Sequence, residues 1–177
     1  QDPEYSRHVS MGWNYRMPEL CSAVALAQTE NMDALVAIRQ DAAGLFLDAM
    51  SGFEDILKPQ KTPPGATNSY WTLAAALNTK RISWQEFRNQ FLVNGGHGFY
   101  AAWQLTYLEP MFANLELLGR EKFISRANLE KYKKGACPVA EDLQPRLVQF
   151  KTNYWDLNEA REQAEILSKT LAGIARS

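Results

Sequence analysis

Asn14, Tyr15 and Arg16 stand side by side near the start of the chain, and two of the three carry groups that bind anions. An asparagine amide donates hydrogen bonds without adding charge, and a guanidinium pairs with phosphate or carboxylate through two parallel hydrogen bonds. Pro18 follows, and proline suits the first turn of a helix. Because the first N–H groups of a helix lack partners within it, anions commonly bind there. The triplet predicts an anion-binding loop; an ordinary loop before a core helix is the alternative.

The residue types that bind metals form no pattern. Cys21 and Cys137 are far apart, and neither joins His8 or His97 at a spacing typical of metal ligands. We therefore expect no metal site. Two unpatterned cysteines suit a reducing cytoplasm, with a single structural disulfide as the alternative.

Two helices are expected directly after the triplet. In the first, one face at helical spacing holds small and apolar residues, namely Leu20, Ala23, Val24 and Ala27. The second is capped by Asp33 and ended by Gly52. Its inward residues are Leu35, Ile38, Ala42, Leu45 and Ala49, with Phe46 and Met50 widening the face. The first helix is thus predicted to carry the binding loop.

The following segments alternate between strand and helix. Residues 53–57 could form a short strand, 58–68 a loop, and the apolar run 69–78 a strand buried on both faces. Ser83-x-x-Glu86 has the form of a capping box, and Gly95-Gly96 ends the helix that it opens. Residues 98–108 are expected to be a strand or an extended loop.

Two helices are predicted in the last third of the chain. Pro138 begins a short one that Pro145 ends, and Asp156 or Asn158 caps a long terminal one. The inward residues of the long helix are Ala160, Ala164, Leu167, Leu171 and Ile174. Together the elements predict an α+β fold with a small antiparallel sheet covered by helices.

The composition is that of an ordinary globular protein, with 177 residues, 46% of them hydrophobic and 22% charged. Its 19 basic and 20 acidic residues give a formal charge of −1, which provides no electrostatic footprint for nucleic acid or anionic membranes. No apolar run approaches the roughly 18 to 20 residues of a membrane span. We expect no nucleic-acid partner, no membrane association and a cytoplasmic location.

The segment Gly12-x-Asn14-Tyr15-Arg16-Met17, followed by an alanine-rich helix that ends at Gln28, resembles the signature of DegT/DnrJ-type nucleotide-sugar aminotransferases. These enzymes use pyridoxal 5′-phosphate and have fold type I. By this resemblance, residues 1–32 are the end of the large domain, with the cofactor and interface loop and its helix. Residues 33–177 are then the small C-terminal α+β domain, which begins with a long linking helix.

The lysine that binds the cofactor in this family is not found. Family members place it five residues after a serine, ahead of a glycine-rich segment, and none of the nine lysines here has a serine at that position. The chain also begins with Gln1 rather than methionine. We expect the C-terminal portion of a longer enzyme, which cannot transaminate by itself.

The resemblance implies roles for the residues of the triplet. Asn14 would contact the cofactor phosphate of the neighbouring subunit in a homodimer whose sites are shared. Arg16 is a second candidate for the cofactor, with a structural interface role as the alternative. Tyr15 is a candidate substrate contact, and packing of its ring under the loop is the alternative.

Further candidate substrate contacts are His8, His97 and Tyr100. His8 precedes the motif, where family members often carry aromatic or histidine residues close to the sugar; an exposed terminal histidine is the alternative. His97 and Tyr100 lie where members vary with their sugar, and a core strand is the alternative there.

The reaction that this resemblance implies is transfer of an amino group from glutamate or glutamine to a keto sugar, and the family's substrates imply that this sugar is linked to a nucleotide. A second interpretation keeps the fold but makes the enzyme a pyridoxamine-phosphate-dependent sugar dehydratase, in which histidine replaces the lysine. A third is a noncatalytic module that associates through the small-residue helix.

Overall fold

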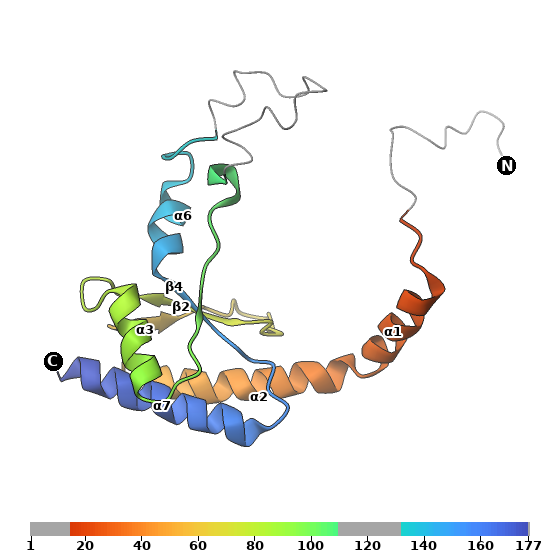
Figure 1. Ribbon diagram of the computed structural model, residues 1–177, viewed down its shortest axis with the longest axis horizontal. Helices are drawn as coiled ribbons and strands as arrows, with labels where there is room; N and C mark the ends of the chain where they lie inside the picture. Colours follow the sequence, from red (N-terminus) through yellow and green to blue (C-terminus); the bar gives the residue numbers. More distant parts are fainter. Residues whose placement is uncertain (1–14, 110–131, 177) are drawn as a thin grey trace. The chain divides into compact units, whose positions relative to one another are not determined.

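The computed structural model describes residues 15–109 and 132–176 (Figure 1). The chain divides into two compact units, Gln1–Leu35 and Val36–Ser177, and the division falls within a helix. The first unit holds α1 (Glu19–Glu30) and the start of α2 (Met32–Met50). The second holds the rest of α2, a four-stranded sheet and the helices that pack on it.

α1 follows the triplet as predicted, but none of its residues is buried. Pro18 is the N-cap residue, and its carbonyl oxygen accepts hydrogen bonds from the N–H and the hydroxyl of Ser22 at 2.9 and 3.1 Å. On the face predicted to point inward, Leu20 is 79% exposed and Val24 59% exposed. The first unit contributes too few other described residues to cover this face.

α2 begins at Met32, two residues before the start that a cap at Asp33 predicts, so the expected cap is wrong. Asp33 lies in the first turn, where a carboxylate still interacts favourably with the N-terminal N–H groups. The helix ends before Gly52 as expected, and the φ of +84° at Gly52 is one that glycine adopts readily. Its buried residues, all in the second unit, are Ala42, Ala43, Phe46 and Met50.

The sheet is antiparallel throughout, which confirms the predicted α+β class. Its strands β1 (Leu57–Pro59), β2 (Leu73–Leu77), β3 (Tyr100–Ala101) and β4 (Leu147–Phe150) lie in the spatial order β1-β2-β4-β3. In the central pair, Leu73 is opposite Phe150. On the other side of β4, Tyr100 is opposite Gln149.

The predicted strands differ from the observed ones in length and position. Residues 53–56 form a turn, and β1 takes the first residues of the expected loop. β2 is shorter than the predicted run, and only one of its faces is buried, because Leu73, Ala75 and Leu77 alternate with partly exposed alanines. Only two residues of 98–108 form a strand. β4 was not predicted.

The predicted helices of the second unit are confirmed as α3 (Trp84–Val93), α6 (Pro138–Leu143) and α7 (Leu157–Ala175), with 3-10 turns at Thr106–Leu108 and Gln144–Arg146. Both expected N-caps form: the Ser83 hydroxyl accepts the Glu86 N–H at 3.1 Å, and the Asp156 carboxylate accepts the Asn158 N–H at 2.8 Å. Within the described ranges, no helix has the length and apolar character needed to cross a bilayer.

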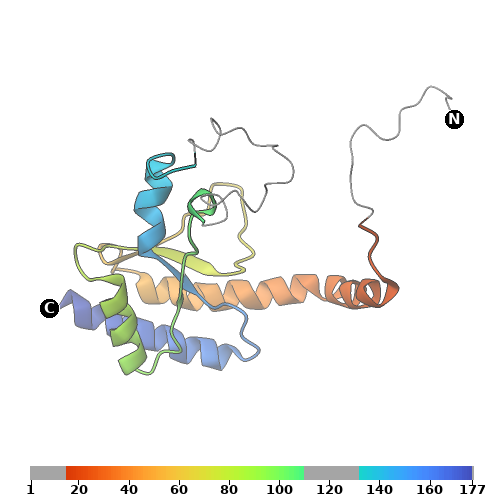
Figure 2. The ribbon, with the colours of Figure 1, turned by 45° about the horizontal axis from the view of Figure 1, so that its top comes forward.

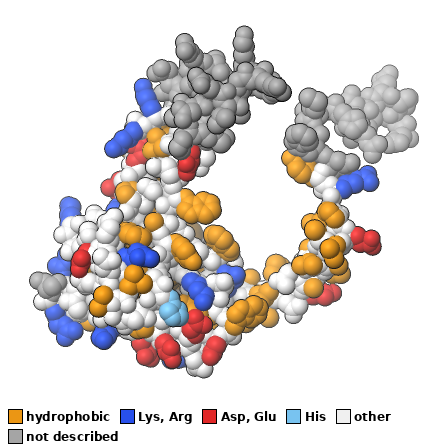
Figure 3. All heavy atoms as spheres, in the orientation of Figure 1, with side chains coloured by type: hydrophobic (Ala, Val, Ile, Leu, Met, Phe, Trp, Pro, Cys, Tyr) orange, Lys and Arg blue, Asp and Glu red, His pale blue; other side chains and the backbone are white. Residues whose placement is uncertain are grey.

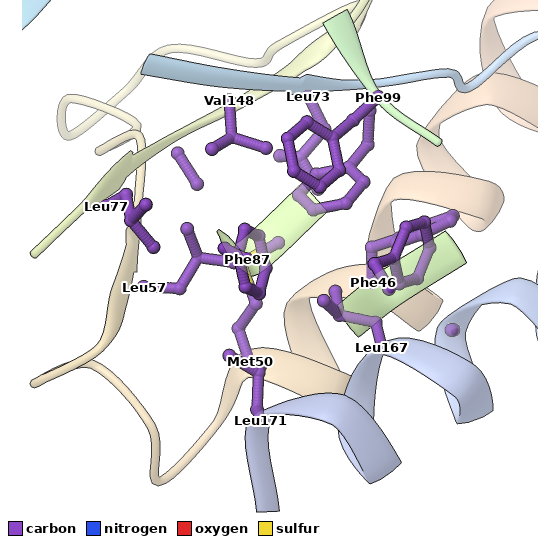
Figure 4. Close-up of a cluster of buried hydrophobic side chains, with 14 of the residues drawn as sticks. Phe46, Met50, Leu57, Leu73, Leu77, Phe87, Phe99, Val148, Leu167 and Leu171 are labelled. Atoms are coloured by element: carbon purple, nitrogen blue, oxygen red, sulfur yellow. The ribbon is translucent and has the colours of Figure 1, made fainter. Parts of the chain in front are cut away.

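The core lies between one face of the sheet and the helices α2, α3 and α7 (Figures 1, 2 and 4). Its centre is aromatic, with ring centroids 5.2 Å apart for Phe46 and Phe150 and 5.1 Å apart for Phe87 and Phe99. Each such pair adds about 0.5–1.5 kcal/mol beyond its buried area. Gly96 fits closely here, since a Cβ at this position would lie 2.5 Å from the Phe91 ring.

Candidate functional site

The described part of the predicted anion-binding loop is exposed. Tyr15 is 85% exposed and has a φ of +40°, in the left-handed region that non-glycine residues seldom adopt. Arg16 is exposed as well. Asn14 and His8 lie outside the described residues.

The start of α1 has features that fit a phosphate group. Pro18 at the N-cap provides no side-chain hydrogen bond to the first N–H groups, and Arg16, two residues earlier, carries a positive charge. The carboxylate of Glu19, in the first turn, would repel an anion and so weakens binding there. The donors and the guanidinium are therefore of the kind that could hold the phosphate of a cofactor.

His97 is attached to α7 rather than to a strand. Its backbone N–H donates to Gln163 Oε1 at 2.7 Å, and its Nδ1 lies 3.5 Å from Glu159 Oε1. Lys151 Nζ lies 3.4 Å from the same Glu159 oxygen and 4.4 Å from the centre of the Tyr154 ring. The imidazole is thus part of a half-exposed charged cluster.

Tyr100 lies on a different element from His97. It stands on the edge strand β3 and is 69% exposed. Between the two residues, Gly98 has a φ of +88° and Phe99 is buried in the core. The predicted core strand is therefore correct for Phe99 alone, and the two candidate substrate residues do not form one compact site.

A hydrogen bond between Tyr107 and Glu141 connects the 3-10 turn Thr106–Leu108 to α6. The phenol donates to Glu141 Oε1 at 2.5 Å, and that carboxylate also accepts the N–H groups of Gly135 and Cys137 at 2.8 and 3.3 Å. Burial raises the pKa of Tyr107 to about 12, and the hydrogen bond and charge of Glu141 add to the rise. The hydrogen bond from Tyr107 is the main cause that lowers the pKa of Glu141. The phenol and the carboxylate therefore have a structural role: their hydrogen bonds hold the 3-10 turn and the residues just before α6 in place.

The segment at Tyr70 and Trp71 was missed by the sequence reasoning, which treated it as part of a buried strand. Tyr70 has a φ of +47°, and Trp71 is 76% exposed. The hydroxyl of Thr152 donates to the carbonyl oxygens of both residues, at 2.5 and 3.2 Å. Arg39 Nη1 donates to the Trp71 carbonyl at 3.3 Å. No local sequence signal indicates this arrangement, because its parts come from distant segments.

The cysteines and acidic residues provide no alternative site. Cys21 and Cys137 are exposed free thiols. Across residues 15–109 and 132–176, no group of three His, Cys, Asp or Glu side chains is placed to hold a metal ion.

The chain belongs to the DegT/DnrJ/EryC1/StrS aminotransferase family, which matches residues 1–163. This confirms the resemblance seen in the Asn14 motif. Among relatives, a GDP-perosamine synthase of Vibrio cholerae is 30% identical over 108 residues, which cover 61% of this chain and 29% of that protein. A GDP-perosamine synthase of Escherichia coli O157:H7 is 26% identical over 136 residues, which cover 77% of this chain and 31% of that protein. The chain spans less than a third of the length of either relative.

Proposed function

We propose that this chain is the C-terminal part of a pyridoxal-phosphate-dependent aminotransferase that moves an amino group from glutamate or glutamine to a nucleotide-linked keto sugar. The observation that carries the proposal is the family match over residues 1–163. Both relatives are named as synthases of a GDP-linked amino sugar, which supports a nucleotide-linked substrate.

The fold supports the same proposal. A small antiparallel sheet with helices on one face suits the small C-terminal domain of a fold type I enzyme. In the proposal, residues 33–177 are this domain, and residues 1–32 are the end of the large domain. The cytoplasm is the proposed location, since exposed thiols such as Cys21 and Cys137 persist in a reducing compartment.

Asn14 and Arg16 are the residues proposed to hold the cofactor phosphate. The amide and guanidinium would donate hydrogen bonds to it, and the uncapped start of α1 adds backbone N–H groups. When bound, pyridoxal phosphate supplies the electron sink and the carrier for the amino group. We place the lysine that binds it in a part of the enzyme beyond this chain, so that the 177-residue chain alone is inactive.

The proposed enzyme is a homodimer with shared sites. The exposed apolar residues of α1, which include Leu20, Val24 and Leu26, support this, because apolar surface of this kind commonly marks an interface. In the dimer, Asn14 of one subunit would reach the cofactor phosphate of the other.

The test compares the 177-residue chain with the longer enzyme that carries it. With glutamate or glutamine, the longer enzyme should convert its cofactor to the amine form, followed by absorbance, and then aminate a nucleotide-linked keto sugar. The short chain should do neither. Turnover by the short chain would contradict its inactivity, and water loss from the sugar without amino transfer would favour a dehydratase.

Substitution of Asn14 tests the assigned site. Asn14→Asp keeps the size of the side chain but replaces its donor with a negative charge, and we expect at least about a tenfold weaker affinity for the cofactor. Asn158→Asp, in the first turn of α7, is the matched control and should bind the cofactor normally. Equal affinity in both variants would remove Asn14 from the site.

A further inference from the structure

The segment Asn68–Trp71 is held in an unfavourable backbone conformation. Tyr70 has a φ of +47°, a region that a bulky side chain with a Cβ avoids. Residues with such strain persist only where the surrounding structure enforces it, and they are common at functional sites. The strain at Tyr70 is therefore expected to be enforced by contacts with other parts of the chain and to mark a candidate functional site.

Three side chains from two other parts of the second unit hold this segment through its main chain. Thr152, which is fully buried, donates its hydroxyl proton to the carbonyl oxygens of Tyr70 and Trp71 at 2.5 and 3.2 Å. From α2, Gln40 Nε2 donates to the Asn68 carbonyl at 2.9 Å and Arg39 Nη1 to the Trp71 carbonyl at 3.3 Å. The conformation is thus built by long-range contacts.

The result is an exposed tryptophan whose main-chain carbonyl is held by a guanidinium. Trp71 is 76% exposed, whereas Leu73, two residues later, is fully buried. The Arg39 guanidinium is fixed at the carbonyl of Trp71 itself, and it pairs with no carboxylate of the described residues. An exposed aromatic side chain and a cation are therefore both present at residue 71, the cation through its hydrogen bond to the main-chain carbonyl of that residue.

We propose that Trp71 and Arg39 bind the nucleotide portion of the nucleotide-linked sugar, with the base on the indole and the phosphates at the guanidinium. This rests on the proposed function. Every nucleobase has a planar face that stacks on an aromatic side chain, and a guanidinium binds phosphate through paired hydrogen bonds. A nucleotide-linked sugar carries both groups.

The basic side chain held at the segment favours an anion. Arg39 supplies a positive charge at the carbonyl of Trp71, whereas Lys151, next to Thr152 in the sequence, is already paired with Glu159 at 3.4 Å. Glu159 also faces His97, at 3.5 Å. Figure 3 shows hydrophobic, basic, acidic and histidine side chains gathered on one face of the second unit. Thr152 is the positioning residue, because its buried hydroxyl holds the main chain of Tyr70 and Trp71.

The test uses the longer enzyme with its cofactor. Trp71→Ala should raise KM for the nucleotide-linked sugar about tenfold, the scale of one base–aromatic stack, and change kcat less than about twofold. Trp71→Phe should retain part of the affinity. Arg39→Gln should raise KM in the same direction. In all of these variants, cofactor conversion by the amino donor alone, glutamate or glutamine, should remain normal, because that half of the reaction does not involve the nucleotide.

Trp103→Ala is the matched control. Trp103 is 87% exposed, but it lies two residues past Ala101, at the opposite end of β4 from Trp71. The KM of the Trp103→Ala variant for the nucleotide-linked sugar should be unchanged. Thr152→Val should raise KM, whereas Thr152→Ser, which keeps the hydroxyl, should restore it; a purely structural role would change thermal stability without this difference in KM.

Two results would overturn the inference. One is an unchanged KM in Trp71→Ala, and the other is loss of the dimer on size exclusion with KM unchanged, which would make Trp71 an interface residue. Failure of the proposed function is distinguishable, since the unsubstituted enzyme would then convert no cofactor with glutamate or glutamine.

Discussion

α1 and α7 are both helices with apolar residues at helical spacing, but only α7 buries them. Seven of its residues are buried, among them Ala160, Leu167 and Leu171, whereas α1 buries none. α7 also has a side-chain cap at Asp156, and α1 has none. Spacing therefore predicts the helix and its apolar face, but the rest of the molecule decides whether that face becomes core.

The difference also concerns stability. A helix of 12 residues is marginal in water unless packing supports it, because the cost of starting a helix is recovered over few residues. α7 obtains that support from the sheet and from α3. α1 is expected to obtain it from the part of the enzyme proposed to lie beyond this chain.

The largest contrast is expected from deletion of a core side chain in α7. Leu167 is fully buried, so Leu167→Ala should lower the free energy of unfolding by about 2–5 kcal/mol, through lost burial and the cavity left behind. Urea denaturation of the chain, followed by circular dichroism, measures this. A loss below about 0.5 kcal/mol would mean that α7 is not a core helix.

A somewhat smaller effect is expected at Gly96. A methyl group would stand 2.5 Å from the Phe91 ring, which is itself buried, so Gly96→Ala should cost about 1–3 kcal/mol by overpacking. Gly173→Ala is the control, since nothing lies within 4 Å of a Cβ there, and it should be neutral or stabilising in its helix. Equal stability of the two variants would show that α3 can move away from Gly96.

A smaller, pH-dependent effect is expected in the second unit at Tyr107. Its pKa is raised to about 12, so the folded state binds the phenolic proton more tightly than the unfolded state. The resulting stability is present below about pH 10 and is lost as pH rises toward 12. Tyr107→Phe should flatten the alkaline fall in melting temperature, relative to the exposed Tyr100→Phe. Parallel curves for the two variants would contradict this.

The raised pKa of Tyr107 affects stability at alkaline pH, and the lowered pKa of Glu141 affects stability at acidic pH. The lowered pKa of Glu141 contributes stability above its ordinary value of 4.5, which is lost as pH falls through the lowered value. Tyr107→Phe removes the donor that is the main cause of that lowering. The same variant should therefore also reduce the loss of stability in acid.

The smallest effect is expected in α1. Leu20 is 79% exposed, so Leu20→Ala should change the unfolding free energy of the isolated chain by less than about 0.5 kcal/mol. In the longer enzyme the same substitution should cost more, because the proposed partner surface would cover this residue. Equal effects in both proteins would leave α1 exposed in both and remove its proposed role.

The fold could be predicted where the signal is local. The helices α3 and α7 have caps at Ser83 and Asp156 and apolar residues at regular intervals, and both were placed correctly. β4 was missed because it has four residues, too few for the alternation of Val148 and Phe150 to be distinct. The face of β2 was wrong because Ala74 and Ala76 suit a buried or a half-exposed position equally well.

The site was predictable only as far as the motif reaches. The Asn14 motif led to the family, which residues 1–163 confirm, but the motif says nothing about Trp71. Tyr70 and Thr152 are 82 residues apart, and a positive φ at tyrosine is not expected from any local pattern. His97 was found as a polar residue after two glycines, whereas its attachment to Glu159 and Gln163 depends on how α7 packs.

The order of strands in the sheet has a consequence for how the second unit folds. β2 cannot complete its hydrogen bonds until β4 has been synthesised and has paired with it. Leu73 and Phe150, which are opposite each other in this pair, are separated by more than half of the second unit's sequence. Pairing over such a separation is slow, because a long loop must close before any contact compensates for it. During synthesis on the ribosome, the elements that emerge first are α2, β1, β2 and α3. Their apolar faces stay exposed to solvent until the later elements cover them. Only when Leu167 and Leu171 have left the exit tunnel can this core close, so chaperones have their longest opportunity to bind here.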